Sequence, residues 1–167
     1  MLVYGGFREG EVLGIHAEDC DMANKVINVC HQVVTVKGGM ILSEPKTKSS
    51  KRAVTLPAVA YNALKHHLEQ LHKKQGLIFT TSSGKPISPR NFIRHFKQTV
   101  QNLGIPDLSP HSLRHSHASL LLASGVNPKI VQERLGHSSI TLTLNTYSHV
   151  IPSLQEEAAR RLDDLMG

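Results

Sequence analysis

The chain has 167 residues, a length that can enclose one sizeable hydrophobic core but hardly two. Its formal net charge of +6 and isoelectric point near 9.5 suit a polyanionic partner, although many basic proteins bind no nucleic acid. Two cysteines are too few for a disulfide framework and no apolar run approaches the roughly 18 to 20 residues of a membrane span, so composition excludes disulfide-rich secreted scaffolds and membrane proteins.

The first third of the chain is expected to form a short helix and a small sheet. Residues 9–16 have helical spacing, whereas residues 24–36 are rich in β-branched side chains and predict a strand. Gly38 and Gly39 predict a turn, and further strands are expected over residues 40–44 and 52–56, joined by the lysine-rich segment 45–51. Together these segments predict a three-stranded antiparallel sheet near the N-terminus.

The remainder of the chain predicts helices. Apolar residues at helical spacing begin after Pro57 and end before Gly76. Three later helices, over residues 88–102, 109–124 and 127–135, each open with an N-cap residue followed by proline: Ser88-Pro89, Ser109-Pro110 and Asn127-Pro128. Two more helices are expected over residues 139–149 and 152–165. The predicted fold class is therefore α+β and mainly helical.

The first chemical motif is the segment His111-Ser112-Leu113-Arg114, in the first turn of a predicted helix. His111 and Arg114 are three residues apart, so they share one helical face and can reach the same phosphate, where the helix N-terminus also offers free N–H groups. His111, His115 and His117 raise the alternative of a metal site. No nearby cysteine or carboxylate completes a metal-ligand set, and Arg114 would repel a cation, so we expect no metal here.

The second motif is Leu135-Gly136-His137, followed ten positions after the histidine by Tyr147. Taken alone, a tyrosine on a helix is usually packed at the edge of a core. The ordered pattern H-x-x-R, then L-G-H, then a tyrosine about ten residues later resembles the C-terminal boxes of the tyrosine recombinases of the phage-integrase family, especially integrases of phages and conjugative transposons. The resemblance implies that Tyr147 is the nucleophile.

The N-terminal segment extends this resemblance. The family carries its first catalytic arginine in a segment similar to T-G-x-R-x-x-E-L/V, which residues 6–13 (GFREGEVL) match with Arg8 and Glu11. Gly5 stands where threonine is often found, a departure that a tight turn tolerates. Without the later boxes, Arg8 and Glu11 would be an ordinary exposed pair on a helix. The resemblance implies that Arg8 contacts the phosphate and that Glu11 orients an arginine or histidine.

A catalytic lysine on a β-hairpin is a further property of the family. The segment 45–52 (PKTKSSKR) occupies the corresponding place, and Lys46 in P-K-T matches best. Lys48 or Lys51 could serve instead, and a lysine-rich turn is often only a solvated loop. The resemblance implies that the catalytic lysine protonates the leaving 5′ oxygen.

The implied reaction is a transesterification at a DNA phosphodiester, for which we expect no cofactor. Its transition state spreads negative charge over the non-bridging oxygens. Arg8 and Arg114 can clamp these oxygens through bidentate hydrogen bonds, and His111 and His137 can donate others. The resemblance favours His111 as the base that takes the phenolic proton of Tyr147. A covalent 3′-phosphotyrosine conserves the energy of the broken bond and permits religation.

Affinity for DNA is expected to come from other basic residues on the hairpin and on the helix over residues 88–102. These are Lys48, Lys51, Arg52, Arg90, Arg94 and Lys97. Arg90, Arg94 and Lys97 share one helical face. Phe92 and Phe96 on the same helix must point to a core, so the basic residues could also be only the solvated side of an amphipathic helix.

The domain organisation follows from the same resemblance. Relatives carry a DNA-clamping domain and a leading helix before this segment, for which residues 1–6 leave no room. We therefore expect residues 1–151 to form a catalytic domain without these parts and not to complete recombination alone. Residues 152–167 predict a charged helical tail that packs on its own domain or on a neighbouring protomer.

The predicted function is site-specific recombination that integrates or excises a mobile element at double-stranded DNA attachment sites. A homo-oligomer, tetrameric on DNA in the full-length protein, is expected, with accessory DNA-bending proteins considered as further partners and no membrane. The expected location is the bacterial cytoplasm, on the nucleoid when DNA is bound. A type IB topoisomerase is an alternative, but the L-G-H box and the short interval to Tyr147 favour recombinases. A non-catalytic DNA-binding module that retains the fold is another alternative. Chemically competent residues at all six catalytic positions argue against it.

Overall fold

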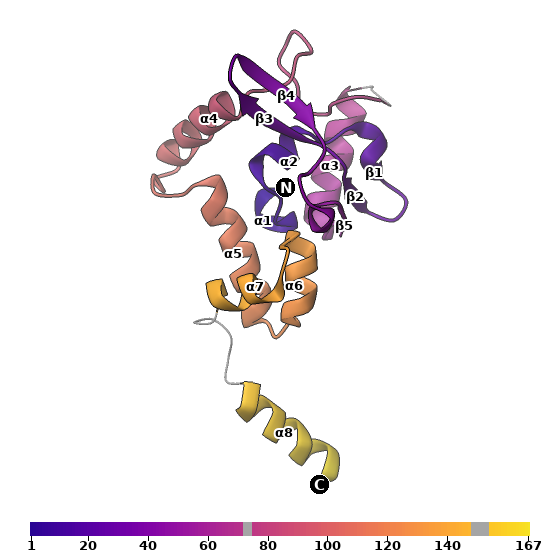
Figure 1. Ribbon diagram of the computed structural model, residues 1–167, viewed down its shortest axis with the longest axis vertical. Coiled ribbons are helices and arrows are strands. Elements are labelled where there is room, and N and C mark those ends of the chain that lie inside the picture. The colour runs from indigo at the N-terminus through magenta and orange to yellow at the C-terminus, as the bar shows by residue number, and fades with distance from the viewer. Residues whose placement is uncertain (72–74, 148–153) are drawn as a thin grey trace.

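Helices form most of the protein, and a small β-structure lies near the N-terminus (Figure 1). The computed structural model describes residues 1–71, 75–147 and 154–167. Its helices are α1 (Leu2–Gly5), α2 (Glu9–Leu13), α3 (Ala58–Leu71), α4 (Pro89–Asn102), α5 (Pro110–Ala123), α6 (Pro128–Leu135), α7 (Ile140–Tyr147) and α8 (Leu154–Met166). The strands are β1 (Cys20–Asp21), β2 (Val26–Val29), β3 (Gln32–Val36), β4 (Gly39–Ser43) and β5 (Arg52–Thr55), and the 3₁₀ helices are η1 (Ala17–Asp19) and η2 (Lys48–Ser50). The predicted mainly helical α+β class is confirmed.

The strand predicted over residues 24–36 is interrupted at Cys30 and His31. β2 pairs antiparallel with β1 and β5, whereas β3 pairs with β4 in a separate two-stranded sheet. The interruption lies where the chain crosses α2: a Cβ added at Gly14 would lie 2.7 Å from the carbonyl oxygen of His31. A three-stranded antiparallel sheet is present, but its order is β1-β2-β5, so the expected membership was wrong.

The helix starts read from the sequence are confirmed by their caps. The Ser88 and Ser109 hydroxyls each accept a hydrogen bond of 3.0 Å from the backbone N–H three residues on. The Asn127 side chain accepts one of 2.8 Å from the backbone of Lys129. Gly136, with φ 68°, ends α6 in the left-handed conformation that favours glycine. The expected end of α7 at residue 149 and the expected start of the last helix at Pro152 lie outside the described residues.

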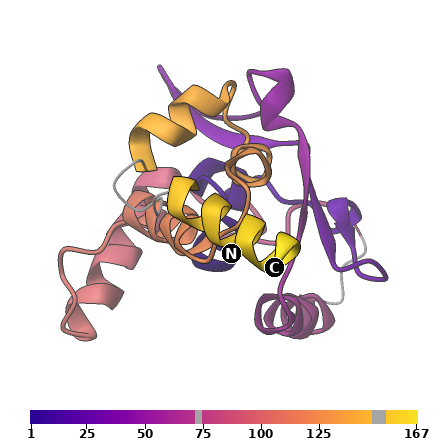
Figure 2. The ribbon, with the colours of Figure 1, turned by 90° about the horizontal axis from the view of Figure 1, so that it is seen from below.

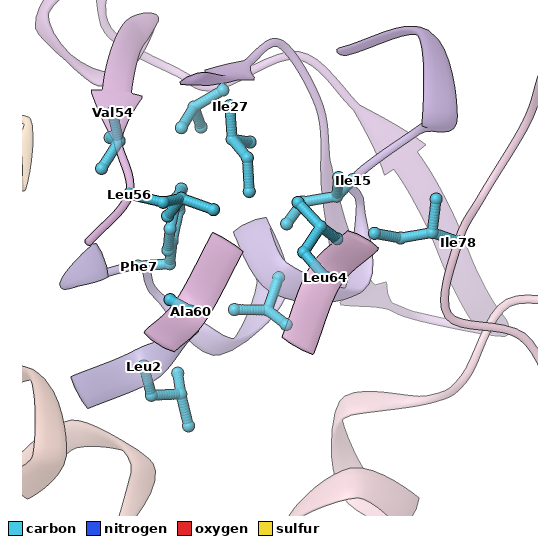
Figure 3. Close-up of a cluster of buried hydrophobic side chains, with 11 residues drawn as sticks. Leu2, Phe7, Ile15, Ile27, Val54, Leu56, Ala60, Leu64 and Ile78 are labelled. Atoms are coloured by element: carbon cyan, nitrogen blue, oxygen red, sulfur yellow. The ribbon is translucent and has the colours of Figure 1, made fainter. Parts of the chain in front are cut away.

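Two clusters of buried side chains hold the body together. The larger one joins α1, α2, β2, β5 and α3, and Figure 3 shows its side chains gathered between these elements. The smaller one joins α5, α6 and α7 and includes Leu135 and Tyr147. Tyr147 is therefore fixed by the packing of three helices against one another.

α8 lies beyond α5, α6 and α7 at one end of the molecule (Figures 1 and 2). Its Leu162, Leu165 and Met166 are exposed. Among the described helices, none is long and apolar enough to cross a membrane.

Candidate functional site

Arg8 precedes α2 and is held by Glu11 one turn later. Its backbone N–H and its guanidinium both donate to the Glu11 carboxylate, at 2.8 and 2.7 Å. The Arg8 side chain is 41% exposed, whereas that of Glu11 is 2% exposed. A second guanidinium hydrogen bond of 3.3 Å reaches the carbonyl of Gly136. The N-terminal arginine segment is thereby joined to the L-G-H segment.

Arg52 is the second partner of Glu11. Its Nη1 and Nη2 donate to the two carboxylate oxygens at 3.0 and 2.9 Å, and its Nε donates to the carbonyl of Arg134 at 2.6 Å. Burial raises the pKa of Glu11, but the hydrogen bond and charge of Arg52, together with Arg8, outweigh it and hold that pKa below its usual value. With a side chain only 6% exposed, Arg52 lies inside the protein. This burial leaves little of the Arg52 side chain for a surface contact, and its contact with DNA stays a prediction.

Arg114 is buried between two segments that are far apart in the sequence. Its guanidinium donates to the carbonyl of Gly6 and, at 2.6 Å, to the carbonyl of Leu135. Burial lowers the pKa of Arg114, and the positive charge of Arg8 lowers it further. The Arg114 side chain thus connects the segments that carry Arg8 and His137.

A pocket of about 430 Å³ brings four of the predicted catalytic residues together. Its lining comprises Phe7, Arg8, Glu9, Pro110, His111, Arg114, His137 and Leu142. These residues come from the start of α2, the start of α5, the loop after α6 and the first turns of α7. Two guanidinium groups and two imidazoles around one cavity make a site for an anion with several oxygens.

His137 is held by the neighbouring helix. Its Nδ1 lies 2.9 Å from the hydroxyl of Thr143, which is fully buried on α7. Burial lowers the pKa of His137 to about 4, with further lowering by Arg114 and Arg8. The ring is therefore neutral near pH 7.

Tyr147 is 2% exposed, and its hydroxyl lies 2.8 Å from Nδ1 of His115. The Nε2 atom of His115 lies 2.7 Å from Nε2 of His111, so a row of three side chains leads from the pocket to the phenol. Burial raises the pKa of Tyr147, while the charge of Arg114 opposes that increase. Burial also lowers the pKa of His115, as do the neighbouring His111 and Arg114. The tyrosine hydroxyl itself is outside the pocket lining.

His115 was not predicted as a site residue, because it entered the sequence argument only as a metal-ligand alternative. The signal available was its position four residues after His111, which places both on one face of α5. The third histidine of that alternative is engaged elsewhere. His117 Nδ1 lies 2.6 Å from the carbonyl of Val3, and its Nε2 accepts a hydrogen bond of 3.0 Å from Arg134. These contacts separate His117 from the other two.

The remaining predicted residues lie on the surface. Lys46 and Lys48 are exposed, and Lys51 forms an ion pair of 2.6 Å with Glu44. None of these lysines lines the pocket in the described chain, so a catalytic lysine stays a prediction.

The basic face of α4 is also exposed: it comprises Arg90, Arg94 and Lys97. Phe92 and Phe96 of the same helix pack against the larger cluster. The arrangement agrees with both interpretations of this face, as a DNA contact and as a solvated surface.

Comparison with known proteins gives consistent matches along the chain. The model of the phage integrase family matches residues 1–153. A XerC-like tyrosine recombinase of Caldanaerobacter subterraneus subsp. tengcongensis is 34% identical over 188 residues, covering 99% of this chain and 48% of the relative. The ICEBs1 integrase of Bacillus subtilis strain 168 is 32% identical over 174 residues, covering 96% of this chain and 46% of the relative.

A solved structure has the same architecture. The Tn1549 transposon integrase in complex with transposon right end DNA superposes with a TM-score of 0.82 and 27% identity, covering 99% of this chain and 57% of that one. The chain spans about half the length of the curated relatives it matches.

Proposed function

The chain belongs to the phage integrase family, and from this membership we propose that it is the catalytic part of a site-specific recombinase that integrates or excises a mobile element. Its substrate is double-stranded DNA at attachment sites. The observation that carries the proposal is the convergence of Arg8, His111, Arg114 and His137 on one pocket. These are the residues that the sequence motifs select for holding a phosphodiester.

The pocket binds the scissile phosphate through its two arginines. The exposed guanidinium of Arg8 and the buried one of Arg114 contact the non-bridging oxygens, and His111 and His137 supply further hydrogen bonds. Glu11 acts on the phosphate only indirectly, because it holds Arg8 and Arg52 in place without lining the pocket. The carboxylate keeps the cationic side chains in place before DNA arrives.

Cleavage transfers the phosphate to the tyrosine. The phenolic oxygen of Tyr147 attacks phosphorus, the bond from phosphorus to the 5′ oxygen breaks, and the 3′ phosphate stays on the enzyme. The phenolic proton passes to a histidine base, and the departing 5′ oxygen takes a proton from Lys46. His115 is the imidazole adjacent to the phenol in this structure, and His111 lies next in the row.

The buried position of Tyr147 adds a requirement to this mechanism. Its hydroxyl faces His115 and lies outside the lining of the pocket. Arg114, which lines the pocket, also interacts electrostatically with Tyr147, so the phenol lies beside the proposed phosphate site and attack requires its hydroxyl to be directed into the pocket. The adduct is expected only on duplexes that the enzyme can bind and distort.

Assembly on DNA is proposed to use α8. The exposed fractions of Leu162, Leu165 and Met166 are 57%, 82% and 85%, an apolar set without cover in this single chain. We propose that this helix packs on a neighbouring protomer of a homo-oligomer. Deletion of residues 152–167 should leave a species that sediments as a smaller assembly on DNA, and an unchanged assembly would contradict the exchange.

A nicked suicide substrate tests the catalytic proposal. Duplexes carrying the end sequences of the encoding mobile element are incubated with the chain, with and without EDTA, and resolved by denaturing electrophoresis. We expect a covalent protein–DNA adduct that is lost in Tyr147→Phe and kept in Tyr61→Phe, which removes a hydroxyl from α3. Binding without any adduct, in protein shown to be folded, would instead support a non-catalytic module.

A further inference from the structure

A second cluster of ionisable side chains lies where η1 meets the junction of β2 and β3. His16 precedes η1, Asp19 ends it, and His31 stands between the two strands. The Asp19 Oδ2 atom lies 3.4 Å from Nδ1 of His31 and 3.7 Å from Nδ1 of His16. One nitrogen or oxygen atom from each of the three side chains lies within 4.8 Å of the other two. None of the three lines the pocket described above.

His16 has a buried polar atom without a hydrogen-bond partner at this cluster. Its Nδ1 is buried and has no hydrogen-bond partner among the described residues. The His16 and His31 rings meet edge to face, with centroids 4.5 Å apart. A buried ring nitrogen without a partner is unfavourable, because it has lost its water without gaining another contact. In the tautomer with the lone pair on Nδ1, a bound cation would remove this penalty.

We propose that His16, Asp19 and His31 form a binding site for a divalent transition-metal cation of the zinc type. Two imidazole nitrogens and one carboxylate oxygen are ligands that Zn²⁺ accepts, with water in the fourth position. Ligand atoms bound tetrahedrally at about 2.0 to 2.1 Å lie roughly 3.3 Å from one another. The separations of 3.4 and 3.7 Å from Asp19 are close to that value, and the two histidine ligand atoms lie within 4.8 Å of each other, so side-chain rotations can bring the three atoms into place.

The surroundings favour a cation and give it access. The side chain of His31 is 36% exposed, while those of His16 and Asp19 are 14% and 11% exposed, so the open side carries a solvent ligand. Glu18 adds a further negative charge that interacts with both histidines. In a chain with a net charge of +6, this is a locally acidic place.

The location indicates a structural role. His31 lies against Gly14, where an added Cβ would be 2.7 Å from the His31 carbonyl oxygen and 2.7 Å from Cα of Gln32. Gly14 directly follows α2, the helix that Arg8 precedes. A cation bound by His16 and Asp19, which follow α2, and by His31, which lies between β2 and β3, would fix the junction of these strands onto the end of α2. It would stabilise the position of Arg8 without contacting the reacting phosphate.

Metal binding is measured directly with Zn²⁺ and Co²⁺ on the purified chain, after treatment with EDTA and its removal. Calorimetry should give one tight site, and the bound Co²⁺ spectrum should show tetrahedral nitrogen and oxygen ligation. In His31→Gln, which alters the most exposed of the three ligands, affinity should fall by about 100-fold or more. His95→Gln, a change to an exposed histidine on α4, should bind as the wild type does.

Thermal unfolding provides a second readout that does not depend on activity. With Zn²⁺ at about 100 times its Kd, the Tm of the wild type should rise by roughly 5 °C or more. His31→Gln should unfold at the wild-type temperature in EDTA and gain nothing from Zn²⁺. Tight binding that survives in His31→Gln and Asp19→Asn would place the metal elsewhere, for example at His111 and His115. That result, or the absence of binding by the wild type, would overturn the proposal.

Discussion

The hydroxyl of Tyr147 lies 2.8 Å from Nδ1 of His115, thirty-two positions away along the chain. Because His115 also approaches His111, the phenol is linked to the pocket through an imidazole that no motif selected. Burial lowers the pKa of His115, as do His111 and Arg114, and this favours the neutral form, which can accept a proton.

Substitution of His115 should therefore slow cleavage. His115→Ala is expected to reduce the rate of adduct formation on the nicked duplex by roughly 100-fold, at least as much as His111→Ala, because the group next to the phenol is lost. DNA affinity should be unchanged, and His95→Ala on α4 serves as the control. A wild-type rate in His115→Ala combined with a slow His111→Ala would assign the base to His111, as the family resemblance implied.

Replacement of Arg114 by lysine should abolish most activity despite the retained charge. Its guanidinium donates to the carbonyls of Gly6 and Leu135 while lining the pocket, and a single ammonium group cannot reproduce this planar geometry. We expect adduct formation to fall by about 1000-fold and stability to decrease by about 1 to 3 kcal/mol. The exposed Arg94→Lys should be nearly neutral in both assays. Activity within tenfold of the wild type would show that charge alone suffices at position 114.

The sequence predicted the parts of the site that depend on short-range order. Residues at the start of α5 are placed by the Ser109 cap and the helical spacing of His111 and Arg114, so their convergence on one pocket followed from neighbours in the chain. Local signals also placed Gly136 at the end of α6.

Other features depend on contacts that sequence spacing does not encode. Arg52 lies in a basic segment that looks solvated, yet a carboxylate 41 positions away draws it into the interior. Similarly, residues 24–36 are rich in β-branched side chains, and the close approach of Gly14 to His31 and Gln32, where the strand is interrupted, is a contact that the sequence pattern does not encode.

The exposed face of α4 should contribute to DNA affinity through phosphate contacts. Replacing Arg90, Arg94 or Lys97 by alanine should each lower the slope of log affinity against log salt by about 1, because one fewer counterion is released. The test is fluorescence anisotropy over a range of salt concentrations, with Lys65→Ala on α3 as the control. Unchanged slopes in all three variants would identify this face as merely solvated.

His117 should make the stability of the protein depend on pH. Burial lowers its pKa to about 4, with Arg134 contributing, so the unfolded chain binds a proton more readily than the folded one. The stabilisation is complete above the unfolded value of about 6.5 and is lost as pH falls from there towards 4, by about 2 to 3 kcal/mol. Urea unfolding at pH 4.5 and 7.5 measures it. His117→Gln should reduce this dependence but not abolish it, because the pKa of His137 is also lowered to about 4, and an equal dependence in wild type and variant would exclude a contribution from His117.

Glu11 should be the most costly charge to remove, because it is buried between two guanidinium groups. In Glu11→Gln, Arg52 keeps its charge in a site where its side chain is 6% exposed, and loss of one partner of a buried pair costs about 3 to 5 kcal/mol. The exposed Glu44→Gln, which breaks only the surface pair with Lys51, should cost far less, because solvent screens that pair.

The pH dependence of the stability difference between the wild type and Glu11→Gln provides a control for this prediction. The pKa of Glu11 is held below its usual value, so the contribution is present above the unfolded value of about 4.3 and is lost as pH falls through the lower folded value. The gap between wild type and Glu11→Gln, measured by urea unfolding, should therefore be largest near pH 7 and narrow in acid. A gap below 1 kcal/mol at pH 7 would mean that the carbonyls of Ser50 and Arg134, which already accept hydrogen bonds from Arg52, are sufficient to hold it.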